Sequence, residues 1–157
     1  MKKIISIIVW LAIATQISYG QNPKSGIGLS IGVISGPGFT FKHFFNEKNA
    51  VKILATPPVL WEGQIVFSNI GISYYRVLSD RNNKKVSIWT SASYMLIYPE
   101  NVFIVPGCGL EDERMLDNKQ AIALSFGWSG FLTTGQHGIF HYQTFPTLQV
   151  EYTFYFK

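Results

Sequence analysis

After about residue 25, apolar and polar residues alternate with a period of two along most of the chain. In the first such stretch, Ile27, Leu29 and Ile31 alternate with glycine and serine. A period of two places the apolar side chains on one face of an extended strand, whereas an amphipathic helix would repeat about every 3.6 residues. The pattern therefore predicts an all-β protein whose strands each have one apolar face and one face of small or polar residues.

Breaks rich in glycine, proline, asparagine and charged residues divide this pattern into eight predicted strands. Pro57-Pro58 is expected to end the third strand, because proline cannot donate to a sheet ladder, and Pro106-Gly107 is expected to interrupt the sixth. A change of phase near Ser68-Asn69 predicts a β-bulge in the fourth strand. The predicted strands cover residues 27–33, 39–45, 50–56, 62–76, 86–98, 102–111, 121–128 and 144–156.

The polar segments between these strands are expected to be turns and loops. We predict solvated turns at the charged residues 79–85 and 111–118, and a polar loop at 133–142. An antiparallel up-and-down β-barrel would accommodate eight strands and place both termini on one side. The loops on the other side would then be residues 35–38, 56–62, 99–101 and 132–143.

The alternation alone does not say which face of the barrel points inward. A soluble barrel buries its apolar face, whereas a membrane barrel turns that face outward to lipid. The interior of an eight-stranded barrel is only just wide enough to be filled by side chains, so it suits the face with small residues better than one of Phe, Ile and Leu. We therefore predict an apolar outer face, with an interior lined by Gly28, Ser30, Gly32, Ala121, Ala123, Ser125 and Gly127.

Three charged residues within strands, Lys42, Lys52 and Glu151, all lie on the small or polar face. Closure of the barrel would bring their strands together, so we predict that these side chains meet in a polar network in the lumen. A lysine facing lipid near the middle of the bilayer would cost about 2–4 kcal/mol. The alternative, which the pattern leaves open, is that all three are exposed on a soluble sheet.

Aromatic residues cluster toward the predicted strand ends. This position suggests the interfacial girdles of a membrane barrel, although aromatic residues also pack in ordinary cores. The residues assigned to the girdles are Tyr74, Tyr75, Tyr94, Tyr98, Trp128, Phe131, Tyr155 and Phe156.

Residues 1–20 have the three zones of a secretory signal peptide: a basic start, an apolar stretch of about ten residues and small residues before the cut. We predict cleavage between Gly20 and Gln21, which leaves residues 21–157 as a single barrel domain. The formal charge then falls from +4 to +2, with eleven Lys and Arg against nine Asp and Glu. This charge is too small to indicate nucleic-acid binding.

Cys108 is the single cysteine, which excludes an intramolecular disulfide, and we expect it to be a small buried residue. Charged residues make up only 14% of the chain and aromatic residues 15%. Soluble proteins average about 25% charged residues, so this composition favours a protein whose outer surface does not face water.

Four segments carry a likeness to a known class of protein: residues 18–21, 26–32, 38–42 and 150–156. Together they resemble the small, eight-stranded outer-membrane β-barrel families of Gram-negative bacteria over essentially the whole mature length. The resemblance implies a location in the outer membrane, in contact with its lipid. It also implies recognition by the barrel assembly machinery through the alternate residues Tyr152, Phe154 and Phe156 of the last strand.

Candidate chemistry is sparse. His137 and His141 are four residues apart, but zinc needs three or four ligands and no cysteine or acidic residue in that loop completes the set. The acidic residues 111–113 and Asp117 lack the spacing and the glycine of a recognised calcium loop. We expect no metal and no other cofactor.

An acyl-transfer enzyme would need a nucleophile and a supported base. His43 with Ser35 or Ser73 could supply these groups, but nothing in the sequence brings them together. We therefore predict a non-enzymatic integral outer-membrane barrel of structural or interaction role, with a lumen filled by side chains. The alternatives are a secreted or periplasmic lipocalin-like barrel that binds a small apolar ligand and a lipid-modifying outer-membrane enzyme.

Overall fold

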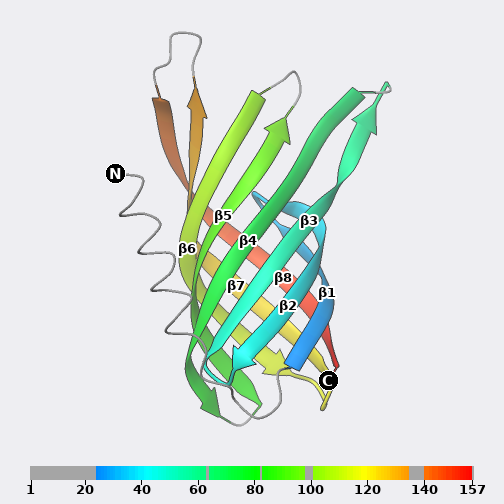
Figure 1. The fold of residues 1–157 in the computed structure, drawn as a ribbon, viewed down its shortest axis with the longest axis vertical. Helices are drawn as coiled ribbons and strands as arrows, with labels where there is room; N and C mark the ends of the chain where they lie inside the picture. Colours follow the sequence, from blue (N-terminus) through cyan, green and yellow to red (C-terminus); the bar gives the residue numbers. More distant parts are fainter. Residues whose placement is uncertain (1–23, 63, 82, 98–100, 135–139, 157) are drawn as a thin grey trace.

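The structure, a computed structural model, describes residues 24–62, 64–81, 83–97, 101–134 and 140–156 (Figure 1). These residues form eight antiparallel strands, and the first pairs with the last, so the predicted all-β, up-and-down barrel is confirmed. The strands are β1 (Lys24–Gly32), β2 (Gly36–Asn46), β3 (Asn49–Trp61), β4 (Gln64–Arg81), β5 (Lys84–Ile97), β6 (Asn101–Met115), β7 (Gln120–Thr134) and β8 (Phe140–Phe156).

The described residues include no helix long and apolar enough to cross a bilayer. The predicted leader, residues 1–20, and its cleavage site between Gly20 and Gln21 lie outside the described part of the chain, as does Tyr98. These predictions therefore stay predictions.

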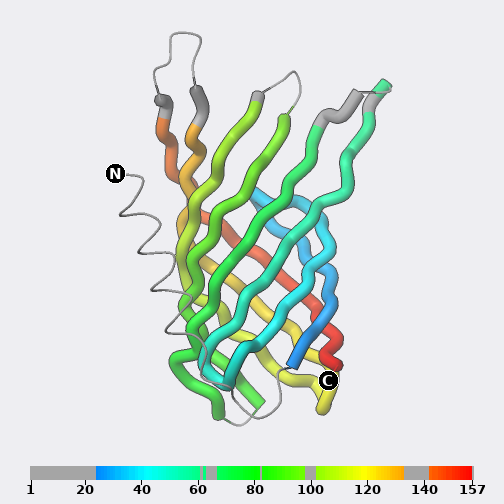
Figure 2. Tube along the Cα trace, in the orientation of Figure 1, coloured from blue at the N-terminus to red at the C-terminus, as the bar shows by residue number. Residues whose placement is uncertain are grey.

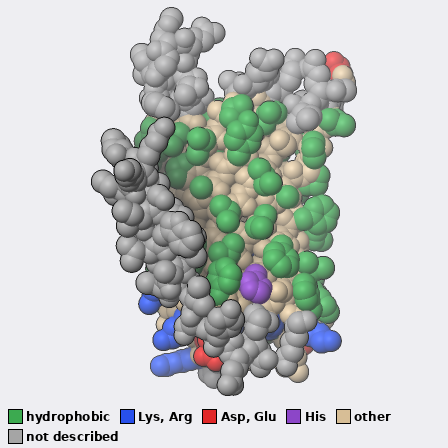
Figure 3. Space-filling model, in the orientation of Figure 1, with side chains coloured by type: hydrophobic (Ala, Val, Ile, Leu, Met, Phe, Trp, Pro, Cys, Tyr) green, Lys and Arg blue, Asp and Glu red, His purple; other side chains and the backbone are tan. Residues whose placement is uncertain are grey.

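The apolar face of the sheet points outward. In β1, the side chains of Ile27, Leu29 and Ile31 are 55%, 59% and 63% exposed, whereas Ser30 is 6% exposed. Figure 3 shows apolar side chains spread over the barrel wall and Lys and Arg side chains near the rim where β1 begins. The predicted orientation is confirmed, since eight strands leave room inside for small and polar groups but not for a second set of large apolar ones.

Short turns connect the strands at the end where β1 begins and β8 ends, which we call the terminus end (Figure 1). Asn46 and Asn49 pair across the β2–β3 turn, and the Asn46 side chain accepts a hydrogen bond from the Lys48 amide at 2.9 Å. Asp117 accepts two amide hydrogen bonds in the β6–β7 turn. Asn83 has φ 61° between β4 and β5, a value that asparagine tolerates better than most residues.

Several predicted strand limits are wrong. β3 continues through Pro57-Pro58 to Trp61, and its pairing with β4 shifts register between Thr56 and Val59. The β4–β5 pairing is unbroken from Phe67 to Val77, so there is no bulge at Ser68-Asn69 between these strands; the shift lies between Val77 and Ser79. At the height of Ser68 the irregularity lies between β3 and β4: Thr56 pairs with Asn69 and Val59 with Phe67, so the additional residue is in β3, at its prolines.

β6 is a regular strand in spite of Pro106-Gly107. Its pairing with β5 is continuous, and the gap lies on the β7 side, where pairing jumps from Ile104 to Gly107. A proline lacks an N–H, so it interrupts only the ladder in which it would donate. β6 then runs to Met115, and the predicted turn at 111–118 is wrong for its first five residues.

The turn predicted at 79–85 and the loop predicted at 133–142 are also shorter than expected. β4 extends to Arg81 and β5 begins at Lys84, while β7 extends to Thr134 and β8 begins at Phe140. Cross-strand pairing therefore continues well into segments that polar composition had suggested were loops. Composition is a weaker guide than alternation because polar side chains are tolerated on either face near strand ends.

The opposite end of the barrel, which we call the loop end, is uneven. The β1–β2 hairpin stops lower than the three other hairpins (Figure 2). β1 pairs with β8 only as far as Gly32 and Gln149, and β2 pairs with β3 only as far as Phe39 and Ala55. We call the resulting gap above the hairpin the notch, bordered by residues 57–61 of β3 and 140–147 of β8; among the described pairings, these residues join only β4 and β7.

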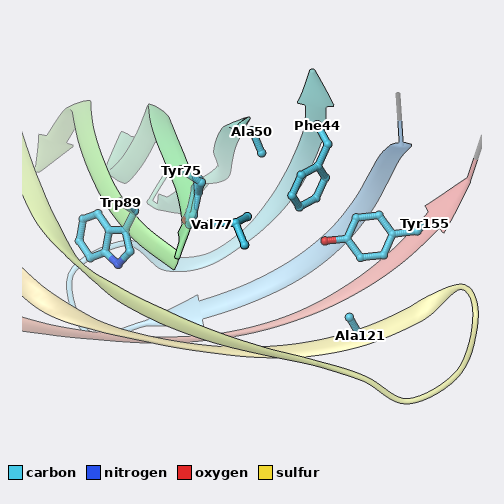
Figure 4. Packing of buried hydrophobic residues seen from close by; sticks show 7 residues of the cluster. All are labelled: Phe44, Ala50, Tyr75, Val77, Trp89, Ala121 and Tyr155. Atoms are coloured by element: carbon cyan, nitrogen blue, oxygen red, sulfur yellow. The ribbon is translucent and has the colours of Figure 1, made fainter. Parts of the chain in front are cut away.

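The inner face near the terminus end carries an apolar and aromatic cluster (Figure 4). Tyr75 and Tyr155 belong to this cluster, and the Phe131 ring contacts the inward side chain of Phe103, so the assignment of these three residues to outer girdles is wrong. Tyr94, Trp128 and Phe156 are exposed on the outer face. The difference depends on whether the residue number is odd or even. In β4, β7 and β8 the odd-numbered side chains point into the barrel, so Tyr75, Phe131 and Tyr155 point inward together with the small and polar residues of the same strands.

Candidate functional site in the barrel lumen

Two lysines face each other inside the barrel. Lys42 of β2 and Lys52 of β3 are direct cross-strand partners, and their side chains are only 3% and 2% exposed. Like charges placed directly opposite destabilise a pair of strands. The pair therefore requires negative charge from elsewhere in the barrel.

Three glutamates supply that charge from the other side of the lumen. Lys42 Nζ lies 2.7 Å from a carboxylate oxygen of Glu111 and 2.6 Å from one of Glu113, both on β6. Lys52 Nζ lies 2.6 Å from Glu151 on β8 and 3.6 Å from the second oxygen of Glu111. We call these five side chains the ion network; they carry a formal charge of −1, and each is at most 3% exposed.

Hydroxyl groups hold the carboxylates in place. The Tyr155 hydroxyl donates to Glu113 at 2.6 Å and the Ser125 hydroxyl donates to Glu111 at 2.9 Å. Thr40 and Thr153 both donate to one oxygen of Glu151, at 3.0 and 2.9 Å. Charge-assisted hydrogen bonds of this kind orient the carboxylates toward the two lysines, so the network spans the lumen from β2 and β3 to β6 and β8.

The aromatic residues around the ion network add further contacts. Both lysine ammonium groups lie 4.9 Å from the centre of the Tyr75 ring, and Lys42 lies 5.3 Å from that of Phe44. At these distances a cation is attracted to the face of the ring, and the attraction is stronger where water is excluded. The network and the aromatic cluster in Figure 4 together fill the terminus end of the lumen.

Of the three residues that the sequence placed in the lumen, the structure joins two directly. Lys52 and Glu151 form an ion pair, whereas the described ion pairs of Lys42 are with Glu111 and Glu113. The sequence missed these two glutamates because they belong to a charged run. The alternation of Gly107, Gly109, Glu111 and Glu113 was the available signal, since the two glycines match the small inward face of the other strands.

Above the ion network lies a small polar cavity of about 60 Å³. Serines from β4, β5 and β7 line it, as do Asn69 and Gln149. Asn69 Oδ1 and Gln149 Nε2 are buried and have no hydrogen-bond partner among the described residues. A buried water needs only about 10–15 Å³ and two or more polar partners, so this cavity suits ordered water.

A much larger cavity, of about 570 Å³, occupies the loop end. We call it the loop-end cavity. Edge-to-face contacts join the rings of Phe103, Phe131 and Phe145, with centroids 5.6 and 5.5 Å apart. Phe67, Met95 and Ile97 complete its inner wall, while Val33 and Ile34 of the β1–β2 hairpin border it below the notch. We predicted a lumen filled by side chains throughout. The lumen is filled at the terminus end, but at the loop end it contains this cavity.

The structure does not assemble the imagined acyl-transfer group. Ser35 and Ser73 line the polar cavity in the lumen, whereas His43 is hydrogen-bonded to Ser25 at 2.8 Å. His43 shares the outward parity of Phe41 and Phe45, so the barrel wall separates it from both serines.

Other sequence candidates are scattered. Cys108 is exposed on the outer face of β6, so the expectation that it is buried is wrong. His137 and the side chain of His141 lie outside what the structure describes. Elsewhere in the described chain, no three His, Cys, Asp or Glu residues are placed to hold a metal ion. Asp117 accepts hydrogen bonds within the β6–β7 turn, while Glu111 and Glu113 form ion pairs with Lys42.

The described residues define an architectural class: an eight-stranded antiparallel barrel with an apolar outer wall and a buried ion network in its lumen. A major outer membrane protein from Thermus thermophilus has a similar structure, with a TM-score of 0.51 at 8% sequence identity, over 87% of this chain and all of that one. At this identity the likeness is one of fold. No family model matches the chain, and no curated protein matches its sequence.

Proposed function

We propose that this protein is a non-enzymatic β-barrel of the bacterial outer membrane, with a structural or interaction role and a lumen closed by the ion network. The observation that carries the proposal is the combination of an apolar outer wall with fully buried charges inside. A soluble monomer rarely exposes contiguous apolar patches larger than a few hundred Å². A lipocalin-like barrel would bury its apolar face, so the outward orientation favours the membrane.

Substitution of one outward residue by lysine tests this placement. Leu148 of β8 is exposed on the outer wall and pairs with the outward Phe126, and Leu116 is exposed in the turn at the terminus end. In a bilayer, Leu148→Lys should lower the free energy of unfolding by about 2–4 kcal/mol. The matched control, Leu116→Lys, should change it little because its side chain lies outside the bilayer. Guanidinium titration of the mature protein in phospholipid vesicles, followed by tryptophan fluorescence, measures both.

Fractionation gives the second test. The mature chain should remain with membranes until detergent is added, and its electrophoretic mobility should change on boiling. A chain that stays soluble without detergent, or equal effects of the two lysine substitutions, would refute the membrane proposal. In planar bilayers the intact protein should show no conductance steps, because the ion network blocks the lumen.

The proposal includes assembly by the barrel assembly machinery through the last strand. Tyr152, Phe154 and Phe156 point outward from β8 and are 39–41% exposed, so their side chains are accessible before lipid covers them. We expect Phe156→Ala to reduce the amount of folded protein in the outer membrane while leaving refolding into vesicles unchanged. Equal loss in cells and in vesicles would instead indicate a defect in stability.

A further inference from the structure

The loop-end cavity lies at the height of the notch, where the described pairings join β3 only to β4 and β8 only to β7. The notch removes the barrel wall between β3 and β8 at this height, and Val33, Ile34 and Pro146 of the cavity lining lie along its border. The apolar outer wall continues alongside it, with Val59 and Leu60 exposed on β3 and, toward the loop end of the neighbouring strands, Trp128 and Tyr142. The apolar lining of the cavity and the apolar outer wall therefore both border the notch.

The strand edges beside the notch are adapted to remain open. An unpaired edge within a membrane leaves backbone donors without partners, which is costly where there is no water. One of the two adjacent prolines Pro57 and Pro58 directs its nitrogen toward the open edge of β3, Pro146 lies in β8 beside the notch, and proline has no N–H to leave unpaired. The hairpin tip below is fixed on both sides: the Thr56 hydroxyl donates to the Ser35 carbonyl at 2.8 Å, and the Val33 amide donates to the Leu148 carbonyl at 3.0 Å.

The chemistry of the cavity lining indicates which kind of ligand the cavity could bind. The lining side chains are apolar or aromatic except for Gln143, and none is charged. Pockets that take small ligands generally measure about 300–1,000 Å³, so the size is suitable for a ligand, but an ionic headgroup would find no partner inside. A flexible hydrocarbon chain attached to a headgroup that remains outside meets both conditions.

We propose that the loop-end cavity binds one acyl chain of a lipid from the surrounding bilayer, which enters sideways through the notch. This inference rests on the proposed membrane location. Entry through the notch lets the chain pass from the bilayer to the phenylalanine cluster without crossing water. Its presence would remove the apolar lining from water, which is favourable because the lining lies in a lumen that opens at the loops.

Photolabelling of the full mature protein in phospholipid nanodiscs tests the proposal. A trace of phospholipid with a diazirine on one acyl chain is activated by light, and the labelled residues are found by mass spectrometry. β7 provides an internal reference, because Phe126 points outward and is 56% exposed while Phe131 points into the cavity. We expect label at both residues.

Two tryptophan substitutions in the β1–β2 hairpin form a matched pair. Ile34→Trp should obstruct the cavity where it borders the notch and reduce the label at Phe131 while leaving Phe126 labelled. Ile31→Trp, at an outward position, should leave both labels unchanged. Heat-dependent mobility shows whether each variant is folded, and the labelling of the unsubstituted protein decides the question if Ile34→Trp is not.

The outcomes separate this inference from the proposal on which it rests. Label at Phe126 without label at Phe131 would overturn the acyl-chain site and leave the membrane location intact. Absence of label at both would refute the membrane location itself. Label at Phe131 from a short, water-soluble diazirine carboxylate but not from the phospholipid would also overturn the inference, because the ligand would then come from the aqueous side.

Discussion

The two ends of the lumen differ in the polarity and the packing of the side chains that line them. At the terminus end, five charged side chains and several hydroxyls pair with one another across the barrel, and Glu113 Oε1 alone among the network's carboxylate oxygens has no hydrogen-bond partner among the described residues. At the loop end, apolar side chains leave a cavity of about 570 Å³. Removing a partner from a polar plug is costly, because it leaves a buried charge, whereas an apolar wall can leave space and still be stable. The comparison suggests that the first end serves stability and the second binding.

The largest expected effect is therefore in the ion network. Lys42→Met would leave Glu113 buried without its cation and Glu111 with only Lys52, at 3.6 Å, and removing one partner of a buried pair typically costs about 3–5 kcal/mol. We expect this loss in the free energy of unfolding, measured by guanidinium titration in vesicles. The double variant Lys42→Met/Glu113→Gln should recover part of it, because one of the uncompensated charges is gone. No recovery would mean that packing, not charge, sets the cost.

A smaller effect is expected between the two ends, where close packing replaces both charge and space. A side chain at Gly127 would lie 2.8 Å from the Trp89 ring and collide with the Cys108 carbonyl oxygen. Gly127→Val should therefore destabilise the barrel by about 1–3 kcal/mol through overpacking. The same titration measures this, and Trp89 should report the strain through its fluorescence. If Gly127→Val lowered the free energy of unfolding as much as Lys42→Met, the ion network would not contribute more to stability than the close packing between the two ends.

Truncation in the loop-end cavity should cost less again. Phe131 is only half-buried and makes two edge-to-face contacts, each worth about 0.5–1.5 kcal/mol. We expect Phe131→Ala to lower the free energy of unfolding by about 1 kcal/mol, since its space is already partly open. If Phe131→Ala unfolds the protein as Lys42→Met does, the loop end is a structural core and not a binding cavity.

The smallest effect is expected at an ion pair outside the lumen. Lys84 and Asp112 are 3.0 Å apart near the terminus end, but the lysine side chain is 45% exposed. Exposed pairs contribute about 0–1 kcal/mol and are screened by salt. Lys84→Ala should therefore be nearly neutral in the same titration, and the small difference should vanish at high salt. A large effect would show that burial is not what distinguishes the ion network.

The alternation of residues was enough to predict strands with two distinct faces, because the period of two has one geometric meaning. The direction of those faces followed from the narrow interior of an eight-stranded barrel, which suits the face with small residues. The alternation also placed Lys42, Lys52 and Glu151 on that face. It could not predict that Glu111 and Glu113 complete the network, since a run of charged residues has the same composition in a turn as in a strand. The notch depends on which pairs stop at Gly32 and Phe39, a matter of register between strands that composition does not encode.

The direct pairing of Lys42 with Lys52 has a consequence for the order in which the barrel forms. The β2–β3 hairpin contains both cations, but their carboxylates lie 69, 71 and 99 residues further along the chain. If it entered the bilayer alone, this hairpin would carry two uncompensated charges into lipid, so partial insertion from the N-terminal side is disfavoured. Neutralisation requires β6 and β8, so, given the proposed membrane location, we expect the barrel to enter the membrane as a nearly complete unit.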